Sequence, residues 1–351
     1  MMSARTLVLP RVMLVRSKVA TMVPPPSHVR FLASSSTSTS SLSPSPLSSI
    51  LTRPERVRRS LFNVPGSDER KMTKAKALPA DSIVFDLEDG VPMDKKGLAR
   101  QLVFDALESF DLGRRERAVR INAIGSGLEL DDLNVILRSP RLQCIVIPKV
   151  SSVADVQFVD RMIDLVAPVP NQGNIRLIAC IETAQGVMDL RAISTASPRL
   201  DALIFASEDL CADMDMVRTP HRRELLFARS AVVTAASAAG LQAIDLVCID
   251  YKDQAVLAVE CAEGRQMGFT GKQAIHPGQI EGIHALFSPT DAEVARATAI
   301  VDGYKEYVAK GVGAFVLDGK MIDAPVVRWA ERLLAKKAAM TSATAPSSSS
   351  K

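Results

Sequence analysis

The sequence predicts a (β/α)₈ TIM barrel because short apolar runs alternate with longer amphipathic segments, and polar residues stand where the runs end. Near-continuous apolar runs are typical of parallel strands that are buried on both faces. Eight such units in succession predict a closed parallel barrel rather than separate hairpins. The runs are Ser60–Val64, Ser82–Leu87, Ala118–Asn122, Gln143–Pro148, Ile175–Ile181, Ala202–Ala206, Gln242–Cys248 and Phe269–Ile275.

A doubly wound open sheet is the alternative fold for the same alternation. No Gly-x-Gly-x-x-Gly or Walker-type loop follows any of the runs, which disfavours a nucleotide-binding open sheet. Between the runs, residues that cap helices precede several amphipathic segments, and Gly240 stands where one helix must stop before the seventh run. The clearest predicted helices are Asp68–Leu78, Val153–Val166, Glu224–Ala239 and Asp253–Met267.

The first residues of the chain differ sharply in composition from the remainder. Residues 1–60 hold nine Arg and Lys and a single acid, Glu55, so their net charge is +8. Because the whole chain has a net charge of +4, the remaining residues together carry −4. Residues 1–57 are rich in Arg, Ser and Pro, which predicts an organelle transit peptide and disordered leader. The stretch Arg30-Phe-Leu-Ala-Ser34 resembles a site at which mitochondrial peptides are cut, so we expect a mitochondrial transit peptide and a matrix protein. A leader that is merely disordered is the alternative.

Composition also excludes several classes of protein. A mildly acidic body argues against nucleic-acid binding, and the absence of an apolar run of 18 residues argues against a membrane span. The five cysteines lie apart without a Cys-x-x-Cys pair, which predicts reduced thiols rather than disulfides or a zinc site. We expect the barrel to occupy residues 58–290, a C-terminal helical lid residues 291–340, and a disordered tail residues 341–351.

Charged residues follow successive predicted strands. In a parallel barrel the carboxyl ends of all strands meet at one face, so these side chains should form one concave site. Two carboxylates without nearby Cys or clustered His favour a hard cation with oxygen ligands, Mg²⁺ or Mn²⁺, which we expect to be held by Glu182 and Asp209. The residues at these ends are Glu88, Arg120, Lys149, Glu182, Asp209 and His276.

The chemistry of such a site follows from its charges. An arginine fork such as Arg120 can bind a substrate carboxylate or stabilise an oxyanion, so metal and arginine together suit chemistry that passes through an enolate. Spacing alone leaves open an aldolase, a lyase, an enolising mutase or a phosphoryl-transfer enzyme. His276 has two equally weighted roles, a hydrogen-bonded cap at the strand end and a contact with substrate.

Seven separated motifs, in order, resemble the HpcH/HpaI aldolase family, which includes citrate lyase β-subunits and malyl-CoA lyases. The stretches 242–250 and 321–325 resemble most the mitochondrial citramalyl-CoA lyase branch of that family. The motifs are Ser60-Leu-Phe-Asn-Val-Pro-Gly-Ser-Asp-Glu69, Phe85-Asp-Leu-Glu-Asp-Gly-Val91, Val119-Arg-Ile-Asn122, Ile147-Pro-Lys-Val150, Ile181-Glu-Thr-Ala-Gln-Gly186, Ser207-Glu-Asp-Leu210 and Gly268-Phe-Thr-Gly-Lys-Gln-Ala-Ile-His-Pro277.

The resemblance implies a magnesium-dependent retro-Claisen cleavage of (3S)-citramalyl-CoA to pyruvate and acetyl-CoA. It implies that Glu182 and Asp209 ligate Mg²⁺ and that Arg120 stabilises the enolate or anchors the substrate carboxylate. Further roles follow for the other positions: Glu88 in catalysis, Lys149, Glu182 and His276 in substrate binding, and Phe62, Pro65, Arg70 and Lys71 in coenzyme A binding. Ala206-Ser207 departs from the two glycines that the family often carries there, which could narrow the pocket.

Asp323 is where resemblance and local pattern diverge. By resemblance it is the general acid/base at the acetyl methyl carbon, on a lid that closes over a neighbouring subunit of a homotrimer after a glycine-containing loop, residues 311–320. By local pattern it is the N-cap of a helix Ala324–Ala338 with Pro325 in its first turn. Malyl-CoA lyase or malate synthase activity with glyoxylate, and a non-catalytic regulatory barrel, are the competing functions.

Overall fold

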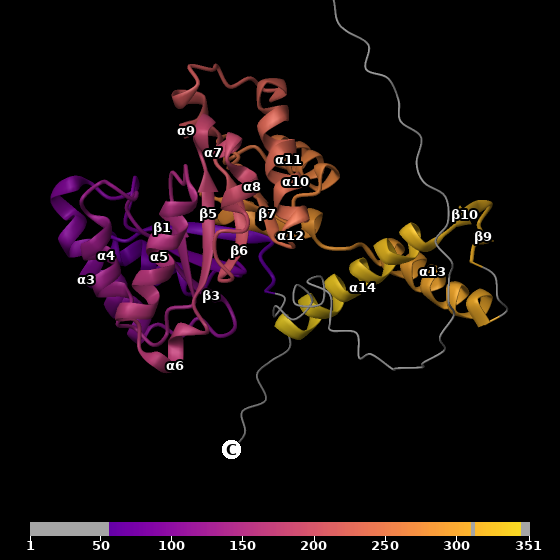
Figure 1. The fold of residues 1–351 in the computed structure, drawn as a ribbon, viewed down its shortest axis with the longest axis horizontal. Helices are drawn as coiled ribbons and strands as arrows, with labels where there is room; N and C mark the ends of the chain where they lie inside the picture. Colours follow the sequence, from indigo (N-terminus) through magenta and orange to yellow (C-terminus); the bar gives the residue numbers. More distant parts are fainter. Residues whose placement is uncertain (1–55, 310–312, 345–351) are drawn as a thin grey trace, which may run out of the picture. The chain divides into compact units, whose positions relative to one another are not determined.

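The computed structural model describes residues 56–309 and 313–344, and it contains the predicted barrel. Eight parallel strands close in sequence order, with β1 hydrogen-bonded to both β2 and β8 (Figure 1). This closure excludes the open sheet. The strands are β1 Ser60–Pro65, β2 Ser82–Asp86, β3 Glu116–Arg120, β4 Cys144–Ile147, β5 Arg176–Ile181, β6 Leu200–Phe205, β7 Gln242–Asp245 and β8 Gly271–Ala274.

Helices and 3₁₀ turns connect the strands. Asp68 starts α2 by accepting a hydrogen bond from the Lys71 N–H at 3.0 Å, and Gly240 stops α10 with a φ of 67°, a left-handed value that glycine adopts without strain. The connecting elements are α2 Glu69–Ala75, η1 Met93–Lys95, α3 Lys96–Ser109, α4 Glu129–Ile136, α5 Val153–Val166, α6 Val169–Gln172, α7 Ala184–Met188, α8 Leu190–Ile193, α9 Ser207–Asp213, η2 Arg223–Leu225, α10 Leu226–Ala238, α11 Gln254–Met267, η3 Pro277–Gln279 and α12 Ile280–Phe287.

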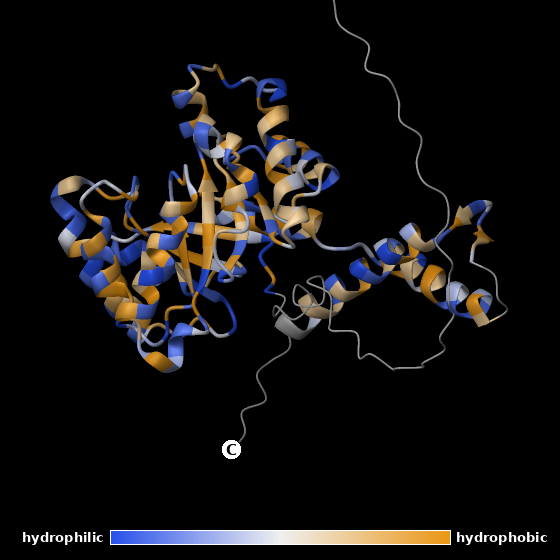
Figure 2. Ribbon diagram, viewed as in Figure 1, coloured by the Kyte–Doolittle hydropathy of each residue, from blue (hydrophilic) through white to orange (hydrophobic). Residues whose placement is uncertain are grey.

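Alternation along each strand divides the core in two, because successive side chains point to opposite faces. The outward positions, such as Phe62, Phe85 and Phe205, join helix residues in the larger cluster between strands and helices. The inward positions are small or medium apolar residues that fill the barrel, and apolar colouring accordingly runs along β5 in Figure 2. The barrel-filling set is Leu61, Val84, Ala118, Cys144, Val146, Ile178, Cys180, Ala202, Ile204 and Ile244.

The amino ends of the strands are closed by a network of buried charges. Arg58, only 2% exposed, donates to both carboxylate oxygens of Glu116 at 2.7 Å and to Asp201 at 3.2 Å. Arg56 adds a 2.8 Å bond to Glu116, and Arg176 pairs with Asp201 at 2.5 Å. Although burial alone would raise it, the charge and hydrogen bonds of Arg58 lower the pKa of Glu116 to about 2.

The C-terminal residues form their own small core. Helices α13 (Asp291–Ala309) and α14 (Ala324–Thr344) flank an antiparallel hairpin of β9 (Phe315–Leu317) and β10 (Lys320–Ile322). The hairpin corrects the loop expected at 311–320, because Asp318 and Gly319 both have positive φ and form the tight turn that joins two strands. Residues 341–344, expected in a disordered tail, continue α14.

The leader to residue 55 and the tail from residue 345 lie outside the described residues. All five cysteines are buried free thiols, as predicted. No helix in the described ranges is long and apolar enough to cross a membrane.

Candidate active site

Three strands carry inward-pointing apolar residues that are followed by charged residues at the carboxyl face of the barrel. Along β2 the buried Val84 is followed two positions later by Asp86, and along β3 Ala118 is followed by Arg120. One residue past the end of β5, Glu182 lies two positions after Cys180. Because alternate residues share a face, these side chains continue the column of residues that fills the barrel. The strands therefore aim them into one space.

Arg120 is held rigidly by acidic neighbours. Its Nε and Nη2 donate to the two oxygens of Asp86, each at 2.7 Å, and its Nη1 lies 2.9 Å from Glu88 Oε2. Such a bidentate pair fixes the plane of the guanidinium. Arg120 remains partly exposed (19% of its side chain) and lines a pocket, so its positive charge is available to an anion there.

Glu88 lies between two cations. Lys149, whose φ of 52° is left-handed, brings its Nζ to 2.8 Å from Glu88 Oε1 and 3.7 Å from Asp209 Oδ1. Burial raises the pKa of Glu88 above its ordinary value despite Arg120 and Lys149. Partial burial alone would lower the pKa of Lys149, but the hydrogen bond to Glu88 and the negative charge of Glu88 raise it. Glu88, Arg120 and Lys149 were all predicted from strand ends, and the structure brings them together.

Glu182 stands apart from these paired groups. The residue is 1% exposed, its Oε2 is buried without a hydrogen-bond partner, and no ion pair within 4.0 Å is found for it among the described residues. Burial, together with the negative charges of Glu88 and Asp209, raises the pKa of Glu182 to about 8. A backbone hydrogen bond from Lys149 and the charge of Arg120 oppose this rise only in part. A buried carboxylate with an unsatisfied oxygen and no ion pair is costly unless it is protonated or bound to a cation.

These residues fit a magnesium ion. Glu182 offers a carboxylate oxygen without a hydrogen-bond partner. Asp209 offers a 39% exposed carboxylate that is close enough for its charge to raise the pKa of Glu182. In the described part of the chain, no group of three or more His, Cys, Asp and Glu side chains is arranged to hold a metal. Mg²⁺ is commonly bound by one or two carboxylates and retains positions for water and substrate, so two acids suffice. Asp209 lies in the first turn of α9 rather than on a strand, which corrects its expected place at the tip of β6.

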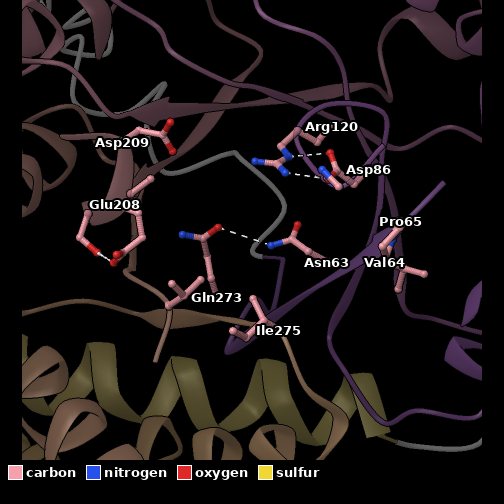
Figure 3. Close-up of a pocket in the computed structure, with 13 residues that line it drawn as sticks. Asn63, Val64, Pro65, Asp86, Arg120, Glu208, Asp209, Gln273 and Ile275 are labelled. Carbon is pink, nitrogen blue, oxygen red and sulfur yellow. Dashed lines mark hydrogen bonds and ion pairs between the residues drawn. The ribbon is translucent and has the colours of Figure 1, made fainter. Parts of the chain in front are cut away.

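A pocket of about 320 Å³ opens at this face of the barrel. Figure 3 shows Asp86 and Arg120 on one side, Glu208 and Asp209 on the opposite side, and Asn63 and Gln273 between them. The lining residues are Asn63, Val64, Pro65, Asp86, Gly90, Arg120, Ala206, Ser207, Glu208, Asp209, Val247, Gln273 and Ile275.

Sequence reasoning had not singled out Asn63 and Gln273 as site residues. The Asn63 Nδ2 lies 3.5 Å from Gln273 Oε1, a contact between the neighbouring strands β1 and β8 in the lining of the pocket. Asn63 follows the inward Leu61 by two positions. A polar residue at an inward position of an apolar strand is the signal that would have found it.

The other predicted contacts have mixed outcomes. Pro65 lines the pocket, and Arg70 and Lys71 are exposed on α2. Phe62 is 7% exposed and packs in the outer core, because it occupies an outward position of β1, so its burial argues against the expected contact with coenzyme A. His276 Nδ1 accepts a hydrogen bond from the Gly278 N–H at 3.1 Å, which is the capping role, and its ring packs against Tyr251.

Asp323 is in the capping position that its local sequence pattern predicts. Its carbonyl accepts from the Val327 N–H at 3.1 Å, and its Oδ1 lies 3.4 Å from the Val326 nitrogen in the first turn of α14. It is not among the residues that line the pocket. Glu182 does not line this pocket either, but no contact found among the described residues joins Asp323 to Arg120 or Glu182.

Comparison with known proteins agrees with this geometry. The family model for HpcH/HpaI aldolase/citrate lyase matches residues 59–277. The mitochondrial citramalyl-CoA lyase of Homo sapiens is 38% identical over 78% of this chain and 84% of its own length. A (3S)-malyl-CoA thioesterase of Cereibacter sphaeroides is 39% identical, covering 80% and 95%. CitE of Mycobacterium tuberculosis, solved with magnesium, acetoacetate and coenzyme A, superimposes with a TM-score of 0.66 at 27% identity, covering 80% and 98%. The chain belongs to the HpcH/HpaI aldolase/citrate lyase family.

Proposed function

We propose that the protein is a magnesium-dependent citramalyl-CoA lyase that cleaves (3S)-citramalyl-CoA to pyruvate and acetyl-CoA. The observation that carries the proposal is the buried, unpaired carboxylate of Glu182 within electrostatic range of Asp209 and the fixed cation of Arg120. Similarity to the human mitochondrial citramalyl-CoA lyase supports the substrate. The solved relative with magnesium and coenzyme A supports the metal and the thioester.

The residues supply complementary parts of the reaction. Glu182 and Asp209 would hold Mg²⁺, which supplies positive charge to the oxygen that becomes the keto oxygen of pyruvate. Arg120, oriented by Asp86 and Glu88, stabilises the thioester enolate that forms as the carbon–carbon bond breaks. We assign Glu88 and Lys149 to positioning, since Glu88 lies 2.9 Å from Arg120 and Lys149 lies 3.7 Å from Asp209. A proton lost from the hydroxyl and a proton gained by the methylene carbon leave the reaction balanced.

We further propose that Asp323 delivers the proton to that carbon from the lid of a neighbouring subunit in a homotrimer. Among the described residues, Asp323 contacts only the first turn of its own helix and neither Arg120 nor Glu182, which supports an origin in another copy. Mixing Asp323→Asn and Glu182→Gln chains tests this directly. Hybrids should regain activity that neither parent has, because some sites would receive an intact metal pair and an intact lid. Hybrids without activity would contradict a lid in trans.

Coenzyme A and the cellular location complete the proposal. Pro65 at the pocket rim and the exposed cations Arg70 and Lys71 on α2 suit the phosphates of coenzyme A. The basic, Ser-rich leader and the mitochondrial relative support import into the mitochondrial matrix.

A malyl-CoA substrate is the second candidate, favoured by the (3S)-malyl-CoA thioesterase that is 39% identical. Malyl-CoA lacks one methyl group, and one methylene in an apolar pocket is worth about 1–3 kcal/mol of discrimination. The pocket lining includes the apolar residues Val247, Ile275 and Ala206, which would favour the methylated substrate.

The deciding experiment is a coupled assay with both thioesters, with and without EDTA. We expect acetyl-CoA and pyruvate from citramalyl-CoA, loss of the activity with EDTA and recovery with Mg²⁺. A higher kcat/KM for malyl-CoA would assign the second substrate. Release of free coenzyme A without acetyl-CoA would assign thioester hydrolysis and contradict the lyase.

A further inference from the structure

We propose that a chain of ion pairs running from β8 to α9, Lys272–Glu260–Arg218–Glu208, positions Asp209 for metal binding, with Arg218 as the positioning residue. The inference rests on the proposed metal role of Asp209. Lys272 and Glu260 do not line the pocket. They are connected through Arg218 to Glu208, which does line it.

The links are direct contacts between alternating charges. Lys272 Nζ lies 2.9 Å from Glu260 Oε2, and both side chains are buried, at 0% and 4% exposure. Arg218 Nη2 lies 3.4 Å from Glu260 Oε1 and donates to the carbonyl of Val247 at 3.0 Å. The Arg218 Nη1 contacts Glu208, whose Oε1 also accepts from Ser207 Oγ at 2.9 Å.

These contacts restrain the turn that carries Asp209. Helix α9 has seven residues, and Asp209 follows Glu208 in its first turn. Asp209 itself has a single described partner, Lys149, at the long distance of 3.7 Å. At the other end of α9, Asp213 accepts a hydrogen bond from the Ala184 N–H at 2.7 Å, and Ala184 follows Glu182 by two residues. Arg218 thus fixes the beginning of the helix and Asp213 its end.

Energetics favour positioning over stability as the function of these charges. Burying an ion pair removes water from both groups, and this cost often cancels the attraction, so such pairs add little net stability. What a connected set of charges does provide is a defined geometry, and here Lys272 Nζ and Glu260 Oε2 are joined by an ion pair without a hydrogen bond. The planar fork of Arg218 suits this role, because it reaches an acid on α9, an acid on α11 and the carbonyl after β7 at once.

The surroundings of Arg218 allow a sharp test. A second cavity of about 430 Å³ is lined by Arg218, Glu208 and Glu260. Truncating Arg218 to alanine enlarges a space that is already open, so an added guanidinium ion can enter and replace the lost group. Urea, a neutral molecule of nearly the same shape, cannot restore the charge. Arg222 is the matched control, since it lies 3.3 Å from the same Glu260 but has no described contact with Glu208.

The experiment measures Mg²⁺ affinity by calorimetry for folded wild-type protein, Arg218→Ala and Arg222→Ala. We expect Arg218→Ala to weaken Mg²⁺ binding by about 10-fold or more, the usual effect of removing a group that orients a ligand. Millimolar guanidinium should recover the affinity and urea should not. Arg222→Ala should stay within about twofold of wild type. Wild-type affinity in Arg218→Ala, an equal loss in Arg222→Ala, or no recovery with guanidinium would overturn the proposal.

A second variant protects the test against a folding defect. Glu208→Gln removes the last link of the chain at a 50% exposed side chain, where little stability is at stake. It should weaken Mg²⁺ binding about as much as Arg218→Ala, and normal binding would also overturn the proposal. No substrate is needed for these titrations. If wild-type protein binds Mg²⁺ but does not cleave citramalyl-CoA, the proposed function fails alone.

Discussion

The two ends of the barrel carry similar clusters of acids and arginines, but the pKa of a buried glutamate is lowered at one end and raised at the other. At the amino end, Glu116 is bonded to Arg56 and Arg58, and its pKa falls to about 2. At the carboxyl end, Glu182 is equally buried but has no ion pair among the described residues, and its pKa rises to about 8. Burial is common to both, so the presence of a cation partner decides the direction.

The difference separates a structural cluster from a functional one. A buried acid with a complete set of partners closes the barrel and needs nothing more. A buried acid without a cation partner, next to other negative charges, is suited to receive a cation that the chain does not itself supply. The same reasoning explains Arg120, which is partnered by acids but still reaches the pocket.

The largest expected effect is on catalysis at the carboxyl end. Glu182→Gln should lower kcat/KM for citramalyl-CoA by about 10³-fold or more, because loss of the metal removes several kcal/mol of transition-state stabilisation. The variant should fold normally, since the change neutralises an unpaired buried acid. Steady-state kinetics and a urea melt check both points. Near-normal activity would remove Glu182 from the metal site.

Asp323→Asn should lower kcat by about 10²–10⁴-fold through loss of a positioned proton donor. Asparagine is also a good N-cap, so α14 should keep its stability, which separates the catalytic role from the capping role. Turnover rate and thermal melting are the measurements. Full turnover would leave Asp323 as a helix cap alone.

At the amino end, Glu116→Gln should destabilise the fold without altering kcat. The substitution leaves Asp201 as the one acid paired with Arg58 among the described residues, and breaking such a buried pair costs about 3–5 kcal/mol. Urea denaturation would measure the loss. A drop in kcat in protein that remains folded would break the division between the two ends.

The smallest expected effect is a proton released on binding Mg²⁺. With a pKa of about 8, metal-free Glu182 is mostly protonated at neutral pH, and it must ionise to bind the ion. Because its pKa is raised on folding from 4.5, the metal-free protein should lose stability as pH rises from about 5 to 8, and Mg²⁺ should restore it. Calorimetry in buffers of different ionisation enthalpy should detect close to one proton near neutral pH and almost none above pH 9. No release at neutral pH would show that Glu182 is already ionised.

Periodicity predicted the barrel well because eight apolar runs must be strands buried on both faces. It also predicted Glu88, Arg120, Lys149 and Glu182 as neighbours, since strand ends converge in a parallel barrel. The direction in which a single side chain of a strand points was harder to predict. Phe62 follows the inward Leu61 and therefore points outward, a distinction that the motif alone did not make.

Contacts made by loops could not be predicted. Arg218 follows Glu208 by ten residues in an irregular segment, and no pattern indicates that its side chain turns back to α9. The hairpin of β9 and β10 did carry a signal, the Asp318-Gly319 pair typical of a tight turn, but its strands are only three residues long.

The most direct test of the difference between the two ends is a calorimetric Mg²⁺ titration of wild-type protein, Glu116→Gln and Glu182→Gln under conditions where all three are folded. We expect wild type and Glu116→Gln to bind one Mg²⁺ with equal affinity, and Glu182→Gln to show no binding. Retained binding in Glu182→Gln, or its loss in Glu116→Gln, would contradict a metal site anchored by the unpaired acid at the carboxyl end.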